Sequence, residues 1–199
     1  MRGFHPWLVV AWLAIVGAGC SSAPVHYYTL TPTPEALPGE TSLAIDVRLI
    51  HSPQQLNRSE LMVRTGPAEV TLLENERWAS PVKDEIKDAL RLELQRRRDR
   101  LAGLSPPFSK LMLDMDVQRF EAELGQYVLL EASWNATLST LGPRSDGARV
   151  TTCTFHADEK IRAGYAGIVE GYQREIAALA DAIVAALTGA SGGTDTRCH

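Results

Sequence analysis

Hydrophobic and polar residues alternate along several stretches of the chain, and this pattern predicts strands with one buried face. In residues 43–49, leucine, isoleucine and valine occupy every second position, between Ala44, Asp46 and Arg48. Residues 111–118 and 128–138 alternate in the same way on either side of Gly125, so we expect a long antiparallel pair. A hairpin is predicted about Gly66-Pro67. The predicted strands are residues 26–30, 43–49, 61–64, 70–73, 111–118, 128–138 and 149–156.

Two longer stretches have the spacing of amphipathic helices. Ser80-Pro81 opens the first helix, with serine at the capping position and proline where a missing N–H does no harm. Its apolar stripe is Val82, Ile86, Leu90 and Leu94. The second helix runs from about Ala163 to Leu187, with a stripe of Ile168, Tyr172, Ile176, Leu179, Ile183 and Leu187.

The order of these elements predicts the fold class. Several strands, a helix, three strands and a closing helix are typical of an α+β (α/β) sandwich. We therefore expect a mixed, mostly antiparallel sheet with two helices packed on one face. No internal repeat is visible, and the length favours one domain, over residues 43–188.

The first 19 residues have the layout of an export signal. Arg2 supplies the positive charge, and Trp7–Val16 is an apolar run of about ten residues, which is too short to span a bilayer. Gly17-Ala18-Gly19-Cys20 resembles a lipobox, in which the cysteine sulfur receives a diacylglycerol, although Gly17 stands where leucine is usual. We predict a signal peptide over 1–19 and lipidation of Cys20; the alternative is an ordinary signal peptide with Cys20 available for a disulfide.

The segments that flank the domain are rich in proline, glycine and small polar residues. Residues 20–42 are interpreted as the lipidated cysteine and its tether, and residues 189–199 as a flexible tail. No second long apolar stretch exists, so lipid on Cys20 is the only membrane attachment that the sequence predicts. The formal net charge of −4 argues against binding to nucleic acid.

Two cysteines remain after Cys20. In an oxidising compartment Cys153 and Cys198 could form a disulfide. Together with His156 and His199 they could instead be imagined as zinc ligands, but nothing in the sequence fixes the tail beside the strand, and we predict no metal site.

A search for catalytic patterns gives no enzyme. The chain lacks Gly-x-Ser-x-Gly, a phosphate-binding glycine-rich loop and His-Glu-x-x-His. Asp114 and Asp116 point to one side of a strand, where paired carboxylates either share acid and base roles or form a solvated face.

Residues 96–100 carry four arginines at the end of the first predicted helix. Such a cluster is typical of a solvated helix C-terminus, and the alternative is that it binds lipid phosphates.

Several stretches together resemble the ABC-type transport auxiliary lipoproteins, the PqiC-like family. They are Tyr27-Tyr28-Thr29-Leu30, residues 56–66 (Leu-Asn-Arg-Ser-Glu-Leu-Met-Val-Arg-Thr-Gly), Glu76-Arg77-Trp78-Ala79-Ser80-Pro81, residues 116–120, residues 128–134, and Phe155 and Tyr165. Their order and spacing cover nearly all of the chain after Cys20, whereas Cys198 lies outside the pattern.

The resemblance implies a non-enzymatic component of an MCE-type intermembrane lipid transport system. Such a lipoprotein is expected on the periplasmic face of the outer membrane, docked onto an MCE-domain protein that bridges from an inner-membrane ABC permease and ATPase. The resemblance also implies that the protein assembles as a homo-oligomeric ring. No cofactor is expected apart from the covalent diacylglycerol and N-acyl lipid on Cys20. A lipid-binding carrier and a periplasmic hydrolase are the competing interpretations.

The residues that carry the resemblance have structural as well as functional interpretations. Arg58 and Arg64 are candidates for a partner or oligomer surface, or they cover a strand edge. Tyr28 is a third candidate, because Tyr27 and Tyr28 lie close to the lipid tether, where one of them could rest at the membrane interface. Trp78 and Trp134 are expected in the core rather than on a contact surface.

Overall fold

The predicted α+β fold is confirmed. The computed structural model describes residues 23–33, 43–104, 108–140, 148–190 and 196–198, and the statements below refer to these residues. They form an eight-stranded sheet of order β1-β4-β3-β5-β6-β7-β8, with β2 paired to β5 beside this path. The elements are β1 (His26–Tyr28), β2 (Ala44–His51), η1 (Gln54–Asn57), β3 (Glu60–Gly66), β4 (Glu69–Trp78), α2 (Val82–Arg96), α3 (Arg98–Ala102), β5 (Lys110–Glu123), β6 (Tyr127–Ser139), β7 (Arg149–Lys160), α4 (Tyr165–Thr188) and β8 (Thr196–Cys198).

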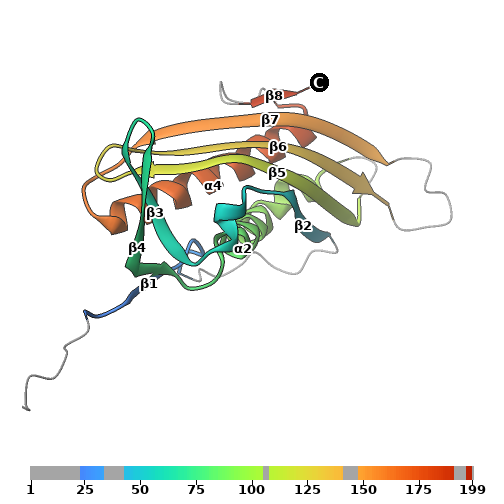
Figure 1. Ribbon diagram of the computed structural model, residues 1–199. Helices are drawn as coiled ribbons and strands as arrows, with labels where there is room; N and C mark the ends of the chain where they lie inside the picture. The colour runs from blue at the N-terminus through green and yellow to red at the C-terminus, as the bar shows by residue number, and fades with distance from the viewer. Residues whose placement is uncertain (1–22, 34–42, 105–107, 141–147, 191–195, 199) are drawn as a thin grey trace, which may run out of the picture.

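Three long antiparallel strands, β5, β6 and β7, form the centre of the sheet. The outer edge of β5 is shared: β2 runs parallel to its first half, and the β3–β4 hairpin joins its end through the pair Arg64 and Glu123. The hairpin therefore stands at the end of β5 remote from β2 (Figure 1). The two shortest strands close the sheet, with β1 parallel to β4 and β8 antiparallel to β7.

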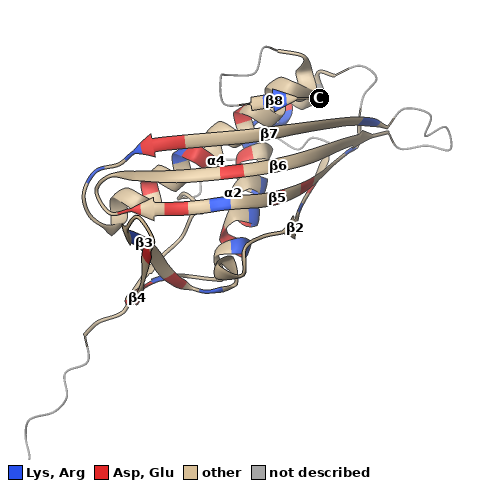
Figure 2. Ribbon diagram, turned by 45° about the horizontal axis from the view of Figure 1, so that its top comes forward, with Lys and Arg blue, Asp and Glu red and all other residues tan. Residues whose placement is uncertain are grey.

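Both long helices cover the same face of the sheet (Figure 1). The alternating residues of β5 that face them, such as Leu111 and Leu113, are fully buried. The opposite face of β5, β6 and β7 carries polar residues, and charged residues occur along each of these strands (Figure 2). One face of the central strands is thus closed by the helices and the other is open.

The core is built on aromatic contacts between the sheet and α4. Phe120 stacks on Tyr172 with ring centroids 3.8 Å apart, and Trp78 packs at a steep angle against Phe120. Trp78 and Trp134 are 3% and 1% exposed, which confirms that both belong to the core.

A glycine allows α4 to lie close to the sheet. A Cβ atom at Gly171 would lie 2.6 Å from the side chain of Ile161 and 2.8 Å from that of Val128. Any larger residue would push the helix away from β6. The helix ends at Gly189, whose φ of 73° is a left-handed conformation that glycine adopts without steric cost.

The first helix begins differently from the sequence prediction. Pro81 stands at the N-cap and α2 starts at Val82, without a side-chain cap. The Ser80 hydroxyl donates instead to a carboxylate oxygen of Glu85, at 2.8 Å. The capping role predicted for Ser80 is therefore wrong, because a buried carboxylate one turn into the helix takes its hydroxyl.

The folded part extends beyond residues 43–188 at both ends. At the N-terminal end, Leu30 is completely buried and β1 belongs to the sheet, so the tether assigned to residues 20–42 is shorter than predicted. At the other end, Thr196–Cys198 pairs with β7, so the prediction of a flexible tail is wrong for these residues. β1 agrees with the strand predicted over residues 26–30, whereas nothing in the sequence pattern predicts that Thr196–Cys198 pairs at a sheet edge.

Candidate functional site

A buried carboxylate on α2 holds the N-terminal segment against the domain. Glu85 is 6% exposed, and it accepts hydrogen bonds from the backbone N–H of Leu30 at 2.9 Å and from the Thr29 hydroxyl at 2.8 Å, besides the one from Ser80. Gln173 on α4 adds a hydrogen bond to the carbonyl of Thr29. The chain that leads back to Cys20 is therefore fixed to both long helices.

Tyr28, one of the predicted surface residues, belongs to the same attachment. Its hydroxyl donates to Glu76 on β4 at 2.7 Å, and the ring of His26 lies 3.0 Å from the same carboxylate. Partial burial, followed by the hydrogen bond to Glu76, raises the pKa of Tyr28 to about 12. Burial alone would raise the pKa of Glu76, but the hydrogen bonds from His26 and Tyr28 hold it below its usual value. Tyr28 thus serves the internal clamp, while the neighbouring Tyr27 is exposed.

Arg58 lies on the other side of the same junction. Its carbonyl accepts the N–H of Val82 at 3.1 Å, just as the carbonyl of Tyr28 accepts the N–H of Ala79 at 2.7 Å. The β4–α2 connection is therefore held between these two backbone carbonyls. The side chain of Arg58 is exposed and has no hydrogen bond or ion pair with any described residue, so it is available to a partner.

Arg64 is positioned quite differently, at the far end of β3. Its guanidinium donates to Glu121 on β5 at 2.9 Å and to the carbonyl of Pro67 at 3.0 Å. The structure therefore uses Arg64 to join the β3–β4 hairpin to β5, and it does not bring Arg64 together with Arg58 and Tyr28. A strand-joining role explains this arginine without a partner.

The pair of Arg64 and Glu121 continues across the open face of the sheet. Arg119 contacts Glu121 at 3.2 Å and Glu131 at 3.4 Å, and the ring of His156 lies 2.9 Å from Glu131. Hydrogen bonds from Arg119 and then from Arg64 hold the pKa of Glu121 below its usual value, against burial. This row of alternating acidic and basic side chains links β3, β5, β6 and β7, and it was not predicted, because its members on different strands are far apart in the sequence.

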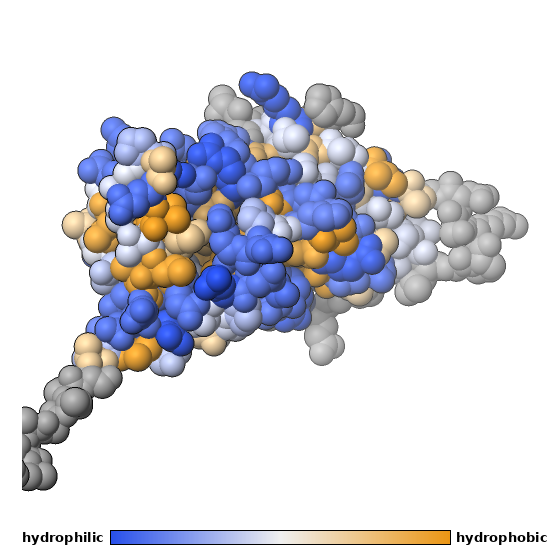
Figure 3. All heavy atoms as spheres, in the orientation of Figure 1, coloured by the Kyte–Doolittle hydropathy of each residue, from blue (hydrophilic) through white to orange (hydrophobic). Residues whose placement is uncertain are grey.

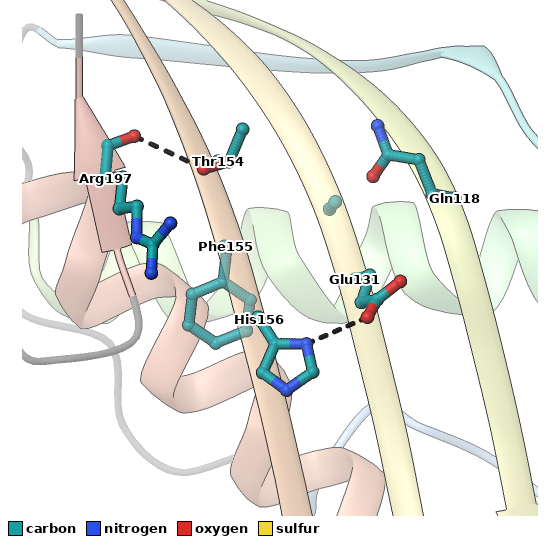
Figure 4. A pocket seen from close by; sticks show the side chains of 7 residues that line it. Gln118, Glu131, Thr154, Phe155, His156 and Arg197 are labelled. Carbon is teal, nitrogen blue, oxygen red and sulfur yellow. Dashed lines mark hydrogen bonds and ion pairs between the residues drawn. The ribbon is translucent and has the colours of Figure 1, made fainter.

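A shallow depression of about 440 Å³ lies on the open face beside this row. In Figure 4, Gln118 projects from β5, Glu131 and His156 face each other from neighbouring strands, and Arg197 extends beside β7 from the edge strand. The Thr154 hydroxyl donates to the carbonyl of Arg197 at 3.4 Å. Its lining mixes polar and apolar residues: Gln118, Glu131, Ala132, Thr154, Phe155, His156 and Arg197.

The aspartates considered as an acid–base pair are bound to basic side chains. Arg48 makes two hydrogen bonds of 2.7 Å to Asp114, and His51 lies 3.1 Å from Asp116. These contacts join β2 to β5 on a solvent-facing surface, which favours the structural interpretation.

The arginine cluster at the end of α2 is paired with acidic side chains. Arg97 donates two hydrogen bonds of 2.8 Å to Asp181 on α4 and also contacts Glu93. Arg100 reaches Asp181 at 3.1 Å, and Arg96 reaches Glu93 at 2.9 Å. The hydrogen bond from Arg97 is the main reason why the pKa of Asp181 lies below its usual value. The cluster joins the two helices, so lipid phosphates are not needed to explain it.

The two cysteines are joined. A disulfide connects Cys153 on β7 with Cys198 on β8, and it fixes the edge strand to the sheet. His199 lies outside the described residues, and within those that are described no three metal-binding side chains cluster. This geometry fits the disulfide interpretation of the cysteines rather than zinc.

One buried carboxyl group has no partner. Glu175 on α4 is 1% exposed, and neither of its carboxyl oxygens has a hydrogen-bond partner in the described part of the chain. Burial raises its pKa to about 9, with further contributions from Glu159 and Asp158 on β7, opposed by Arg174. Glu85 lies on the apolar side of α2, and Glu175 lies on the apolar side of α4. A glutamate within an apolar helix stripe is the sequence signal that could have identified both as buried carboxyl groups.

A second depression lies between α4 and the β8 edge, with a volume of about 480 Å³. Alanines on α4 form much of its wall, and Asp181 and Arg100 lie at its rim. Its apolar residues are Phe155, Ala178, Ala182, Val184, Ala185 and Ala190.

The predicted lipidation residue, Cys20, lies outside the described residues. Among the helices that are described, none is both long and apolar enough to cross a membrane.

Comparisons with known proteins identify one family and two solved structures with a similar fold. Residues 28–184 match the family described as the ABC-type transport auxiliary lipoprotein component. A solved structure described as an uncharacterized protein has a TM-score of 0.57 and 20% identity, covering 81% of this chain and 97% of its own. A protein from Xanthomonas campestris has a TM-score of 0.52 and 18% identity, covering 82% and 96%. These two structures show a shared fold, and no curated protein matches the chain.

Proposed function

The chain belongs to the ABC-type transport auxiliary lipoprotein family, and on this premise we propose that it serves an MCE-type intermembrane lipid transport system. Acyl chains on Cys20 would hold it to the periplasmic face of the outer membrane. There it would dock, as a homo-oligomeric ring, onto the MCE-domain protein that bridges from the inner-membrane ABC permease and ATPase. The observation that carries the proposal is the family match over residues 28–184, which includes α2, most of α4 and the clamp around Tyr28.

The arrangement of the N-terminal segment supports an anchored protein. Five residues separate Cys20 from β1. Because Glu85 and Glu76 fasten the segment immediately after this tether, a lipid on Cys20 would hold the whole domain near the membrane. The family is a transport auxiliary one and not a catalytic one, and the aspartate pair on β5 is bound to Arg48 and His51.

Among the predicted contact residues, Arg58 is the best candidate for the docking surface. Its side chain is exposed and unpaired within the described residues, whereas Arg64 and Tyr28 have internal partners. Arginine is enriched at protein interfaces, because its guanidinium donates several hydrogen bonds in a fixed plane. We therefore assign partner contact to Arg58 and structural roles to Arg64 and Tyr28.

The experiment is affinity purification of the tagged lipoprotein from its own host in detergent, followed by mass spectrometry. Recovery of an MCE-domain protein together with ABC subunits is expected. The substitution Arg58→Glu should abolish this recovery, while Arg91→Glu, on the exposed side of α2, should leave it intact. Equal recovery with both variants would remove Arg58 from the docking surface, and recovery of the lipoprotein alone would contradict the docking role.

A lipid-binding carrier is the second candidate, and the depression between α4 and β8 is the observation in its favour. Its apolar wall and its volume of about 480 Å³ suit one acyl chain. This function predicts that phospholipid copurifies with the lipoprotein in the absence of an MCE protein. It also predicts that Ala182→Trp, which would fill the depression, removes that lipid.

A further inference from the structure

Exposed apolar side chains follow the segment that leaves toward Cys20 and the β4 strand beside it. Seven large hydrophobic residues are exposed in the described part of the chain, and four of them, Val25, Tyr27, Val70 and Leu72, lie on β1, on β4 or next to them. Figure 3 shows apolar surface over the β3–β4 hairpin and beside the departing N-terminal segment. Concentrated exposed apolar surface is a mark of an interaction site.

The strand register places three of these side chains on one face. Leu72 and Val70 pair with Met62 and Arg64, which alternate with the buried Leu61 and Val63 on β3. Glu60 lies on the same face as Met62 and pairs with Arg77, which in turn pairs with Tyr27 on β1. Residues opposite each other in a sheet share a face. We call this set, Tyr27, Val70 and Leu72 with the half-buried Met62, the apolar stripe.

Two arginines on this face are paired with acidic side chains. Arg64 is paired with Glu121 at 2.9 Å, and Arg77 lies 3.7 Å from Glu60. The four stripe residues carry no charge and present apolar area and an aromatic hydroxyl, with the exposed Glu74 next along β4. That combination suits the interface between phospholipid headgroups and acyl chains, where tyrosine is enriched.

The length of the tether decides what this face meets. Ser21–Val25 lie between Cys20 and β1, and fully extended they reach about 20 Å. β1 is fastened to the domain through Glu76 and Glu85, so slack cannot be gained from residues beyond it. β1 and the Tyr27 end of the stripe must therefore stay within about one tether length of the bilayer that holds the acyl chains, and the hairpin carries the rest of the stripe from there.

We propose that the apolar stripe of the β3–β4 hairpin and β1 rests in the interface of the anchoring phospholipid bilayer and so sets the orientation of the domain. This inference rests on the lipid anchor of the proposed function. It directs the opposite end of the sheet, where β7 begins, away from the membrane. The lipid and the stripe then form two attachment points to the membrane. With the lipid alone, the domain would be free to rotate relative to the bilayer.

A tryptophan placed in the stripe tests the proposal. Val70→Trp and Val150→Trp are a matched pair, because both valines are exposed on strands, at 53% and 63%, and lie at opposite ends of the molecule. Each acylated full-length variant is reconstituted in vesicles of phosphatidylethanolamine and phosphatidylglycerol, with or without brominated acyl chains that quench tryptophan on contact. The buried Trp78 and Trp134 give a constant background, which is measured in the unsubstituted protein.

In brominated vesicles, the Val70→Trp variant should lose about half of the fluorescence that its new tryptophan adds to the unsubstituted protein. The Val150→Trp variant should keep all of the fluorescence that its new tryptophan adds. Leu72→Trp replaces Val70→Trp if circular dichroism shows that the latter does not fold. Acylation is verified first by intact-protein mass. An unacylated protein overturns both the anchor and the inference, whereas an acylated protein without quenching at position 70 or 72 overturns the inference alone. A blue shift without quenching that grows with protein concentration also overturns it, in favour of contact with a second copy.

Discussion

The two edge strands of the sheet are equally short but are fastened in different ways. β1 and β8 have three residues each and lie at opposite ends of the strand order. His26 and Tyr28 of β1 bind Glu76, and the next two residues, Thr29 and Leu30, bind Glu85. β8 is held instead by a disulfide to β7. One attachment depends on buried carboxylates and the other on a covalent bond.

The difference teaches how a short strand can be kept on a sheet. Three residues gain too few hydrogen bonds to offset the conformational entropy that they lose, so an extra attachment is required at each edge. At the N-terminal edge the attachment reaches α2 and α4 and orients the chain toward Cys20. At the C-terminal edge the disulfide closes a long loop and depends only on an oxidising compartment.

The largest expected effect is the loss of the covalent attachment. Cys153→Ala with Cys198→Ala removes a link between residues 45 apart in the sequence, which the chain-entropy model values at about 4 kcal/mol. Hydrogen exchange should show β8 released while β5, β6 and β7 stay protected. Denaturant unfolding measures the loss, and a reductant should lower the unfolding midpoint of the wild type but leave the double variant unchanged. Equal midpoints would show that the disulfide does not stabilise the domain in solution.

Loss of the carboxylate clamp should rank next. Glu85→Ala leaves the buried N–H of Leu30 and the hydroxyls of Thr29 and Ser80 without their acceptor, which should cost about 3 kcal/mol. Asp88→Ala, on the exposed side of the same helix, should change the free energy of unfolding by less than about 0.5 kcal/mol. Limited proteolysis should then cut the Glu85→Ala variant near residue 30. A variant as stable and as protected as the wild type would refute the clamp.

The buried carboxyl on α4 sharpens the contrast with Glu85, because it has no donors. The pKa of Glu175 is about 9 in the folded state, and in the unfolded chain it returns to its ordinary value. Between these two values the unfolded chain has released a proton that the folded protein keeps, so stability falls as pH rises, by up to about 1.4 kcal/mol per pH unit. Glu175→Gln should remove this slope, whereas the exposed Glu74→Gln should retain it. Unfolding midpoints at pH 5, 6, 7 and 8 provide the measurement, and parallel curves for wild type and Glu175→Gln would exclude a buried neutral carboxyl.

Much of the fold could be predicted because its central elements repeat a short pattern. The alternation in residues 111–118 and 128–138 identified β5 and β6, and the stripe from Val82 to Leu94 identified α2. The edge strands are harder. β1 was identified by its aromatic run, but Thr196–Cys198 lies in a segment without periodicity, and only its cysteine hinted at an attachment.

Contact residues are harder to predict from the sequence than strands and helices, and the reason is physical. Arginine and tyrosine are suited equally to partner surfaces and to internal ion pairs, and the sequence does not show which acidic group lies nearby. Arg64 meets Glu121, 57 residues later, and Tyr28 meets Glu76, 48 residues later. Arg58 meets none within the described residues, and only the three-dimensional arrangement separates these cases.

The smallest expected effect concerns Tyr28. Tyr28→Phe removes one hydrogen bond of 2.7 Å to Glu76 but keeps the aromatic ring, so it should cost about 1 kcal/mol and lower Tm by about 3 °C. Tyr27→Phe is the matched control: the Tyr27 side chain is 66% exposed, so its loss of a hydroxyl should leave Tm unchanged. Thermal unfolding of the two variants side by side measures the difference. If Tyr28→Phe were the neutral variant, the Tyr28 hydroxyl would not contribute to the clamp, and the side-chain attachment to α2 through Glu85 would begin one residue farther from the lipid.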